Sequence, residues 1–204
     1  FFAICFIIIN FNNPVYSQWT LDQNSNIEYL YVDVLDSSHV FVTGSKSLSY
    51  VGKRSINGTW DSLRTNGISP DKFTVCIAAN DENNIWVGEG IGPNAGADIY
   101  RTTNGGQIWS VQINSGGSTD FINGIQFSRI NPTYGYAWSS PANNTVDPIK
   151  IFKTSNSGVT WAEYSYTQPQ FYTGYRPSIC ITDSNHAWFN LYKSEGIYDT
   201  VRIL

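Results

Sequence analysis

A repeat of about 50 residues runs through this sequence and limits the folds that it can adopt. Residues 102–109 (TTNGGQIW) match residues 154–161 (TSNSGVTW) at an offset of 52. A shortened copy, residues 55–60 (SINGTW), ends 49 residues before Trp109. A fixed period of about 40 to 50 residues is typical of the blades of a β-propeller, which bury their apolar faces only by packing on neighbouring blades.

A second repeat position comes earlier in each unit, in the segments 36–42 (DSSHVFV), 81–87 (DENNIWV), 131–138 (NPTYGYAW) and 183–189 (DSNHAWF). Their aromatic residues are separated by 45, 52 and 50 positions: Phe41, Trp86, Trp138 and Trp188. The other tryptophans occupy the first repeat position: Trp19, Trp60, Trp109 and Trp161. All seven tryptophans therefore fall on two positions of the repeat, which indicates equivalent structural units.

Within one unit, short apolar runs alternate with polar turns. Runs at 74–78, 85–88, 99–102 and 109–113 predict four short strands, the last two joined by the Asn/Gly turn. No stretch shows a sustained period of 3.6 residues, so we expect no helix. The sequence thus predicts an all-β chain, a β-propeller of four-stranded antiparallel blades.

The repeat divides the chain into unequal parts. We expect complete blades at residues 27–67, 68–117 and 118–168, and an incomplete blade at 169–204. Residues 18–26 (QWTLDQNSN) match only a fourth strand, so we expect an outer strand that closes the ring against a later blade. About three and a half blades are too few for a ring of 4 to 8, and the remaining blades are expected beyond Leu204.

The N-terminal residues predict export. Residues 1–9 are an unbroken apolar run, and the small residues Val15 and Ser17 fit cleavage before Gln18, so we expect residues 1–17 to be a truncated signal peptide. A buried strand is the alternative. Nine apolar residues are too short for a membrane span, which takes roughly 20. We therefore expect a bacterial protein that is secreted or displayed at the cell surface.

The net charge and the positions of cysteine and histidine indicate which classes of ligand are disfavoured. The formal net charge is −4, which disfavours binding to nucleic acid. Cys76 and Cys180 stand in similar apolar segments and are expected in the core, while His39 and His186 stand in short turns. No cysteine or histidine pair has the spacing of a zinc site. We expect no metal site and no cofactor.

The segments 102–109 and 154–161 resemble the Asp-box, or BNR repeat, of sialidases, sortilin-type receptors, xyloglucanase-type glycosidases and photosystem II assembly-factor-like propellers. Asparagine stands where the family has aspartate. In such a turn the Asn side chain bonds to the backbone, glycine supplies a positive φ, and tryptophan fills the gap between adjacent sheets. Structural roles are therefore expected for Thr102, Asn104, Gly106, Trp109, Thr154, Asn156, Gly158 and Trp161.

Antiparallel strand order predicts where a binding site would lie. The tight turns between the first and second strands share a rim with the Asn/Gly turns, and the longer loops share the opposite rim. Long loops on a rigid scaffold are the usual place for binding residues. Aromatic residues beside carboxylates suit a sugar or peptide, and the candidates are Glu89, Asp98, Asp120, Asp147, Phe171, Tyr172, Tyr175, Arg176 and Lys193.

Two classes of function follow. The first is a secreted, non-catalytic propeller, similar to sortilin or to photosystem assembly factors, that binds protein or glycan through the long-loop rim. The alternative is a glycoside hydrolase of the xyloglucanase type, in which Asp98 would be one of two catalytic carboxylates. A sialidase fits less well, because Tyr175-Arg176-Pro177 follows the two boxes, whereas sialidases carry their arginine motif ahead of them.

Overall fold

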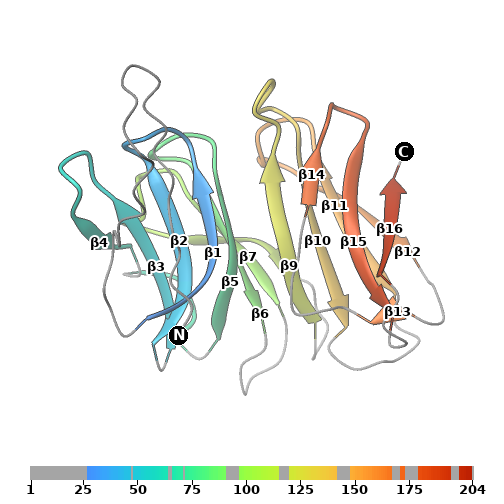
Figure 1. The fold of residues 1–204 in the computed structure, drawn as a ribbon, viewed down its shortest axis with the longest axis horizontal. Helices are drawn as coiled ribbons and strands as arrows, with labels where there is room; N and C mark the ends of the chain where they lie inside the picture. Colours follow the sequence, from blue (N-terminus) through green and yellow to red (C-terminus); the bar gives the residue numbers. More distant parts are fainter. Residues whose placement is uncertain are drawn as a thin grey trace, which may run out of the picture.

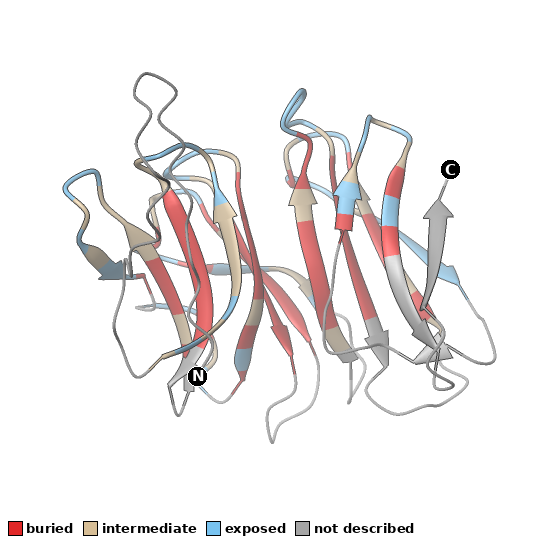
Figure 2. Ribbon diagram, viewed as in Figure 1, coloured by how far each residue is buried: buried red, intermediate tan, exposed pale blue. Residues whose placement is uncertain are grey.

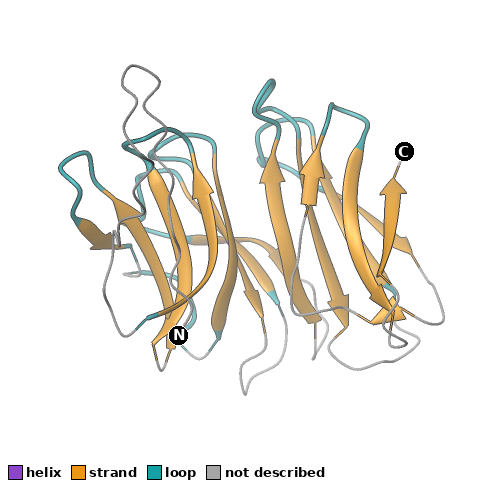
Figure 3. Cartoon of the chain, in the orientation of Figure 1, coloured by secondary structure: helices purple, strands orange, loops and turns teal. Residues whose placement is uncertain are grey.

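The computed structural model describes residues 27–46, 48–63, 66–70, 72–90, 97–114, 120–141, 148–166, 171–172, 179–193 and 198–203. The predicted signal peptide (1–17) and the predicted outer strand (18–26) lie outside these residues. The described residues form sixteen β-strands and no helix (Figure 3). The expectation of an all-β chain is confirmed.

The strands form four sheets, which we call blades 1 to 4 and which stand side by side (Figure 1). Blade 1 contains β1 (Glu28–Val34), β2 (Val40–Lys46), β3 (Leu48–Arg54) and β4 (Trp60–Ser62). Blade 2 contains β5 (Phe73–Ala79), β6 (Ile85–Gly90), β7 (Asp98–Thr102) and β8 (Ser110–Asn114). Blade 3 contains β9 (Asp120–Phe127), β10 (Gly135–Pro141), β11 (Ile149–Thr154) and β12 (Ala162–Tyr166). In each, consecutive strands are hydrogen-bonded and antiparallel.

Blade 4 is built differently. Its strands are β13 (Phe171–Tyr172), β14 (Ile179–Ile181), β15 (Ala187–Lys193) and β16 (Tyr198–Ile203). Both β13 and β14 pair with β15, near its opposite ends, and together they take the place that one first strand holds in the other blades. The strand β16 pairs with β15 along its other side. Blade 4 therefore corresponds to the first three strands of a unit.

The apolar strands of blade 2 are buried on both faces because this sheet lies between blades 1 and 3. In β5, Ile77 and Ala79 belong to a core shared with blade 1. The alternating residues Cys76 and Ala78 belong to a core shared with blade 3. A third core joins blades 3 and 4. Successive side chains of a strand point to opposite faces, so an unbroken apolar run suits a strand between two cores (Figure 2).

The second tryptophan position of the repeat lies in these cores. Trp86 is buried against Phe127 of blade 3, with ring centroids 4.3 Å apart. Trp138 is buried against Phe189 of blade 4, with ring centroids 6.0 Å apart. Trp188, the equivalent residue of blade 4, is 37% exposed. The environment of this indole thus depends on the blade that follows.

The two cysteines do not share one environment, although both were expected in the core. Cys76 is buried, and burial raises the pKa of its thiol above the ordinary value of 9.0. Cys180 is exposed, so the expectation is wrong for this residue. It pairs in register with Trp188 on the face of blade 4 that points away from blade 3. No other described sheet covers that face.

The two Asn/Gly turns have the same internal hydrogen bonds. Thr102 Oγ1 accepts the Gly106 N–H at 3.0 Å, and Asn104 Oδ1 accepts the Ile108 N–H at 3.0 Å. In blade 3, Thr154 Oγ1 accepts the Gly158 N–H at 2.9 Å, and Asn156 Oδ1 accepts the Thr160 N–H at 2.9 Å. The two glycines have φ values of 89° and 70°, which only glycine adopts without strain.

The tryptophan that ends each turn packs between blades. Trp109 is buried in the core shared with blade 1, and its Nε1–H donates to the Leu63 carbonyl at 3.0 Å. Trp161 lies partly buried against the core shared by blades 2 and 3, with its ring 5.8 Å from that of Phe127. Each turn therefore connects its own blade to the preceding one.

Candidate functional site

The two rims of the molecule differ in what builds them. The turns between the first and second strands lie at the upper edge of Figure 1, where β1, β9 and β14 end. The Asn/Gly turns adjoin them, since Gly105 N–H donates to Asn83 O at 3.2 Å and Ser157 N–H donates to Thr133 O at 2.9 Å. We call this edge the turn rim and the opposite edge the long-loop rim.

At the long-loop rim the structure brings two of the predicted candidates together. Glu89 lies near the end of β6 and Asp98 at the start of β7, on either side of residues 91–96. Lys72, just before β5, places its Nζ 2.8 Å from Asp98 Oδ2 and 3.9 Å from Glu89 Oε2. We call these three residues the Lys72 cluster.

The Lys72 cluster is shielded from water. Glu89 is 0% exposed, Asp98 6% and Lys72 8%. Tyr100, also buried, donates its hydroxyl to Asp98 Oδ2 at 3.4 Å. Burial, followed by the charges of Glu89 and Asp98, raises the pKa of Tyr100 above its ordinary value of 10.0, so the phenol stays neutral and serves as a donor.

The geometry of this cluster suits a structural role. A glycosidase keeps two carboxylates on opposite sides of the bond that it cleaves, with space for sugar and water between them. Here the Lys72 ammonium lies within 4 Å of both carboxylates, and Asp98 has almost no exposed surface to offer a substrate. The cluster instead connects the start of β5 to the end of β6 and the start of β7.

The other candidates are placed only in part. Asp120 begins β9, where its backbone pairs with Pro141. Phe171 and Tyr172 form β13, and Phe171 lies directly across from Lys193 of β15, so two predicted candidates are neighbours in register. Asp147, Tyr175 and Arg176 lie outside the described residues.

Sequence reasoning did not identify Lys72. It stands alone before an apolar strand, and its partners are 17 and 26 positions further along the chain. A lone lysine ahead of a strand is ordinary in a sequence. A useful signal would have been the position of Glu89 and Asp98 next to apolar strands. Buried carboxylates require a partner, so a nearby lysine or arginine should have been sought.

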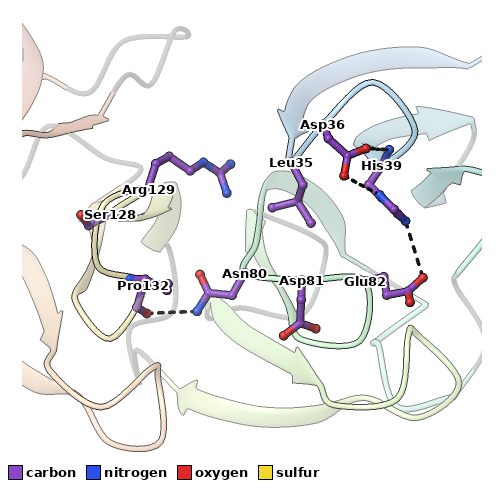
Figure 4. Close-up of a pocket in the computed structure, with 9 residues that line it drawn as sticks. All are labelled: Leu35, Asp36, His39, Asn80, Asp81, Glu82, Ser128, Arg129 and Pro132. Carbon is purple, nitrogen blue, oxygen red and sulfur yellow. Dashed lines mark hydrogen bonds and ion pairs between the residues drawn. The ribbon is translucent and has the colours of Figure 1, made fainter.

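The turn rim holds a pocket that the sequence did not suggest. It has a volume of about 430 Å³ and is formed by turns of blades 1, 2 and 3 (Figure 4). Its lining consists mainly of polar side chains: Leu35, Asp36, His39, Asn80, Asp81, Glu82, Ser128, Arg129 and Pro132. We call it the turn-rim pocket. The recurring Asp-x-x-His and Asp-x-x-Asn turns of the second repeat position could have drawn attention to it.

Each acidic turn at this rim is organised by its own aspartate. Asp36 accepts hydrogen bonds from His39 Nδ1 at 2.8 Å and from Ser38 N–H at 2.7 Å, and these bonds lower its pKa below 3.8. The pKa of Asp81 is also lowered, because hydrogen bonds from Asn84 and Asn83 outweigh its partial burial. Both carboxylates are therefore negative at neutral pH.

Ion pairs connect the turns across blades. Arg129 of blade 3 pairs with Asp33 of blade 1 and donates to the Ala79 carbonyl of blade 2 at 2.8 Å. Lys53 of blade 1 lies 3.3 Å from Glu82 of blade 2. These contacts fix the relative positions of the three turns that surround the pocket.

Two further properties concern the described residues alone. They contain no group of three or more His, Cys, Asp or Glu side chains arranged to hold a metal ion. They also contain no helix of the length and apolarity that a membrane-spanning helix requires.

The fold is that of a β-propeller. A GH74 xyloglucanase from Xanthomonas campestris superposes with a TM-score of 0.58 at 14% identity, over 92% of this chain and 29% of the enzyme. An ancestral GH74 enzyme gives 0.56 at 18% identity, over 83% of this chain and 23% of the enzyme. The NanB sialidase from Streptococcus pneumoniae superposes with a TM-score of 0.55 at 12% identity, over 84% of this chain and 30% of the sialidase.

This chain spans less than a third of the length of each of these enzymes. Its sequence matches no protein-family model and no curated protein. At these identities the similarity establishes the fold alone, and the predicted propeller architecture is confirmed.

Proposed function

We propose that this protein is a secreted, non-catalytic β-propeller that binds carbohydrate through its long-loop rim. The observation that carries the proposal is the burial of Asp98. This carboxylate is the one a hydrolase would need in contact with its substrate, yet it is ion-paired with Lys72 and 6% exposed. The cluster suits a rigid support for the rim.

The choice of carbohydrate rests on two supports. The xyloglucanase and the sialidase that share the fold are named for carbohydrate substrates. In addition, Phe171 and Tyr172 form β13 next to Lys193. Phenylalanine and tyrosine are residue types that stack on sugar rings, and lysine is a residue type that donates hydrogen bonds to sugar hydroxyls. A polypeptide ligand would use the same groups and is an outcome of the test below.

The Asn/Gly turns support the same assignment. We infer that they are Asp-box turns in which asparagine takes the place of aspartate, because the Thr and Asn side chains accept the turn N–H groups and glycine has a positive φ. Such turns stabilise the scaffold, and the rim opposite to them remains for binding.

A binding assay tests the proposal. The purified protein is screened against xyloglucan, other β-glucans, sialosides and a peptide library, with Phe171→Ala/Tyr172→Ala as the test variant and Tyr164→Ala, an exposed tyrosine of β12, as the control. Binding of a glycan should weaken at least about tenfold in the test variant, since burial of one aromatic side chain contributes about 1.5–3 kcal/mol. Binding to peptides alone, or equal loss in both variants, would overturn it.

The hydrolase alternative has one observation in its favour, the juxtaposition of Glu89 and Asp98 at the predicted rim. Prolonged incubation with xyloglucan should release no reducing ends if the protein is non-catalytic. Turnover that disappears in Asp98→Asn but persists in Asp120→Asn would establish the alternative. A fold control is needed, because Asp98→Asn also breaks the ion pair with Lys72.

Secretion is tested on the native gene product. The protein isolated from the culture medium or cell surface should begin at Gln18, the residue that follows the proposed signal peptide 1–17. Recovery of the apolar N-terminal residues in the mature protein would reject this part of the proposal.

A further inference from the structure

The turn-rim pocket is a second place where this molecule could hold a ligand, on the rim opposite to the proposed carbohydrate site. Its volume of about 430 Å³ is within the range of small-molecule sites. Three turns from three blades surround it, with Arg129 on one side, His39 and Glu82 on the other, and Asn80 and Asp81 between them (Figure 4).

The charges around the pocket are unbalanced. The carboxylates of Asp36, Asp81 and Glu82 line it, and Arg129 is the basic residue among its lining that is always charged. That guanidinium is already ion-paired with Asp33, and Lys53 pairs with Glu82. The charge of Arg101 also acts on Asp81. Four carboxylates thus face three cations, and the local field favours a positively charged ligand.

The pocket also offers more acceptors than donors. Asn80 Nδ2 donates to the Pro132 carbonyl at 3.1 Å, whereas Asn80 Oδ1 is buried and has no hydrogen-bond partner among the described residues. In Figure 4 this oxygen lies on the side of the amide opposite to the nitrogen that donates to Pro132. Glu82 is held by Lys53 and His39 through Oε2, and its side chain is 57% exposed.

We propose that the turn-rim pocket binds a protonated primary amine. An ammonium group carries three N–H donors and no acceptor, which matches the surplus of acceptors from Asn80, Asp81 and Glu82. The described lining residues include no Phe, Tyr or Trp, and the apolar ones are Leu35 and Pro132, so the ligand should be small and polar. An amino sugar and a lysine side chain both carry this group.

Calorimetric titration with matched pairs of probes tests the proposal on the intact protein. D-glucosamine is compared with N-acetyl-D-glucosamine, and Nα-acetyl-lysine amide with Nα-acetyl-norleucine amide, which carries no amine. The protonated member of at least one pair should bind at least about tenfold more tightly than its neutral partner, and added salt should weaken it. Preference for glucosamine identifies an amino sugar, and preference for Nα-acetyl-lysine amide identifies a peptide side chain.

Variants locate the binding. Glu82→Gln removes one charge at nearly constant shape and should weaken amine binding severalfold, whereas Glu82→Asp should retain most of it. Glu163→Gln, at an exposed glutamate of β12 outside the pocket, should bind like the unaltered protein. Equal affinity for the charged and neutral probes, no binding of either amine, or unchanged binding in a folded Glu82→Gln variant would overturn the proposal.

Discussion

Carboxylates on the two rims of this molecule are held in opposite ways. On the turn rim, Asp36 and Asp183 are exposed and accept hydrogen bonds from the backbone and histidine of their own turns. On the long-loop rim, Glu89 and Asp98 are buried, and a lysine from a distant segment lies within 4 Å of both. In the first arrangement each aspartate bonds only within its own turn. In the second, three strands are linked through the single side chain of Lys72.

The largest effect is expected from the buried ion pair. Lys72→Met should lower the free energy of unfolding by about 3–5 kcal/mol, because Glu89 and Asp98 remain buried without its charge. The measurement is urea unfolding at neutral pH. Lys53→Met, which breaks the pair with the 57% exposed Glu82 side chain, should cost less than about 1 kcal/mol. Similar losses in the two variants would remove the distinction between the rims.

A smaller effect is expected in the Asn/Gly turn. Thr102→Val keeps the side-chain shape but removes the acceptor of the Gly106 and Asn104 N–H groups, at a site 1% exposed. The loss should be about 1–3 kcal/mol by urea unfolding. Thr103→Val, at the exposed neighbouring residue, should change stability by less than about 0.5 kcal/mol. If Thr102→Val leaves the free energy of unfolding unchanged, the hydrogen bonds of the Thr102 side chain do not stabilise the turn.

The two rims should respond to opposite ends of the pH range. The pKa of Asp36 and that of Asp183 are lowered in the folded protein, so their stabilisation is complete above 3.8 and is lost as the pH falls through the folded values. The pKa of Tyr100 is raised, so its contribution is complete below 10.0 and is lost as the pH rises. Melting temperatures should decline less in acid for Asp36→Asn and less in alkali for Tyr100→Phe. Unchanged profiles would contradict both assignments.

The smallest effect concerns a single backbone position. Ser157 has a φ of 56°, where the corresponding residue of blade 2 is Gly105 with a φ of 68°. Ser157→Gly should stabilise the protein by about 0.5 kcal/mol, since relief of the left-handed strain exceeds the added flexibility of the unfolded chain. Gly105→Ser should destabilise it, because a Cβ there would lie 3.3 Å from Glu82 O. Thermal melting of both variants provides the measurement.

The parts of the fold that follow a local rule could be predicted from the sequence. The spacing of the tryptophans revealed the repeat, and short apolar runs such as 74–78 predicted strands. The Asn and Gly positions of the turns predicted a side-chain bond to the turn backbone and a positive φ, and both are present at Asn104 and Gly106. These features depend on residues that are close together in the chain, so they can be predicted from a single sequence.

The parts that depend on distant segments could not be predicted in this way. Glu89 and Asp98 were proposed as ligand-binding residues, but the sequence does not show that Lys72 lies within 4 Å of both. The turn-rim pocket forms only when Arg129, His39 and Asn80 meet from three blades. Cys180 resembles Cys76 in local sequence, yet its exposure depends on which sheet packs beside it.

Trp86 and Trp138 are each buried by the blade that follows in the sequence, and this has a consequence for synthesis on the ribosome. Trp86 becomes covered only when Phe127 and Gly158 of blade 3 have emerged, and Trp138 only when Ile179 and Phe189 of blade 4 have followed. The tryptophan of blade 2 is therefore uncovered until blade 3 has been synthesised, and that of blade 3 until blade 4 has been synthesised. The fluorescence emission of each of these tryptophans would shift to shorter wavelength when the next blade packs against it. Tryptophan fluorescence would therefore report the order in which the blades fold.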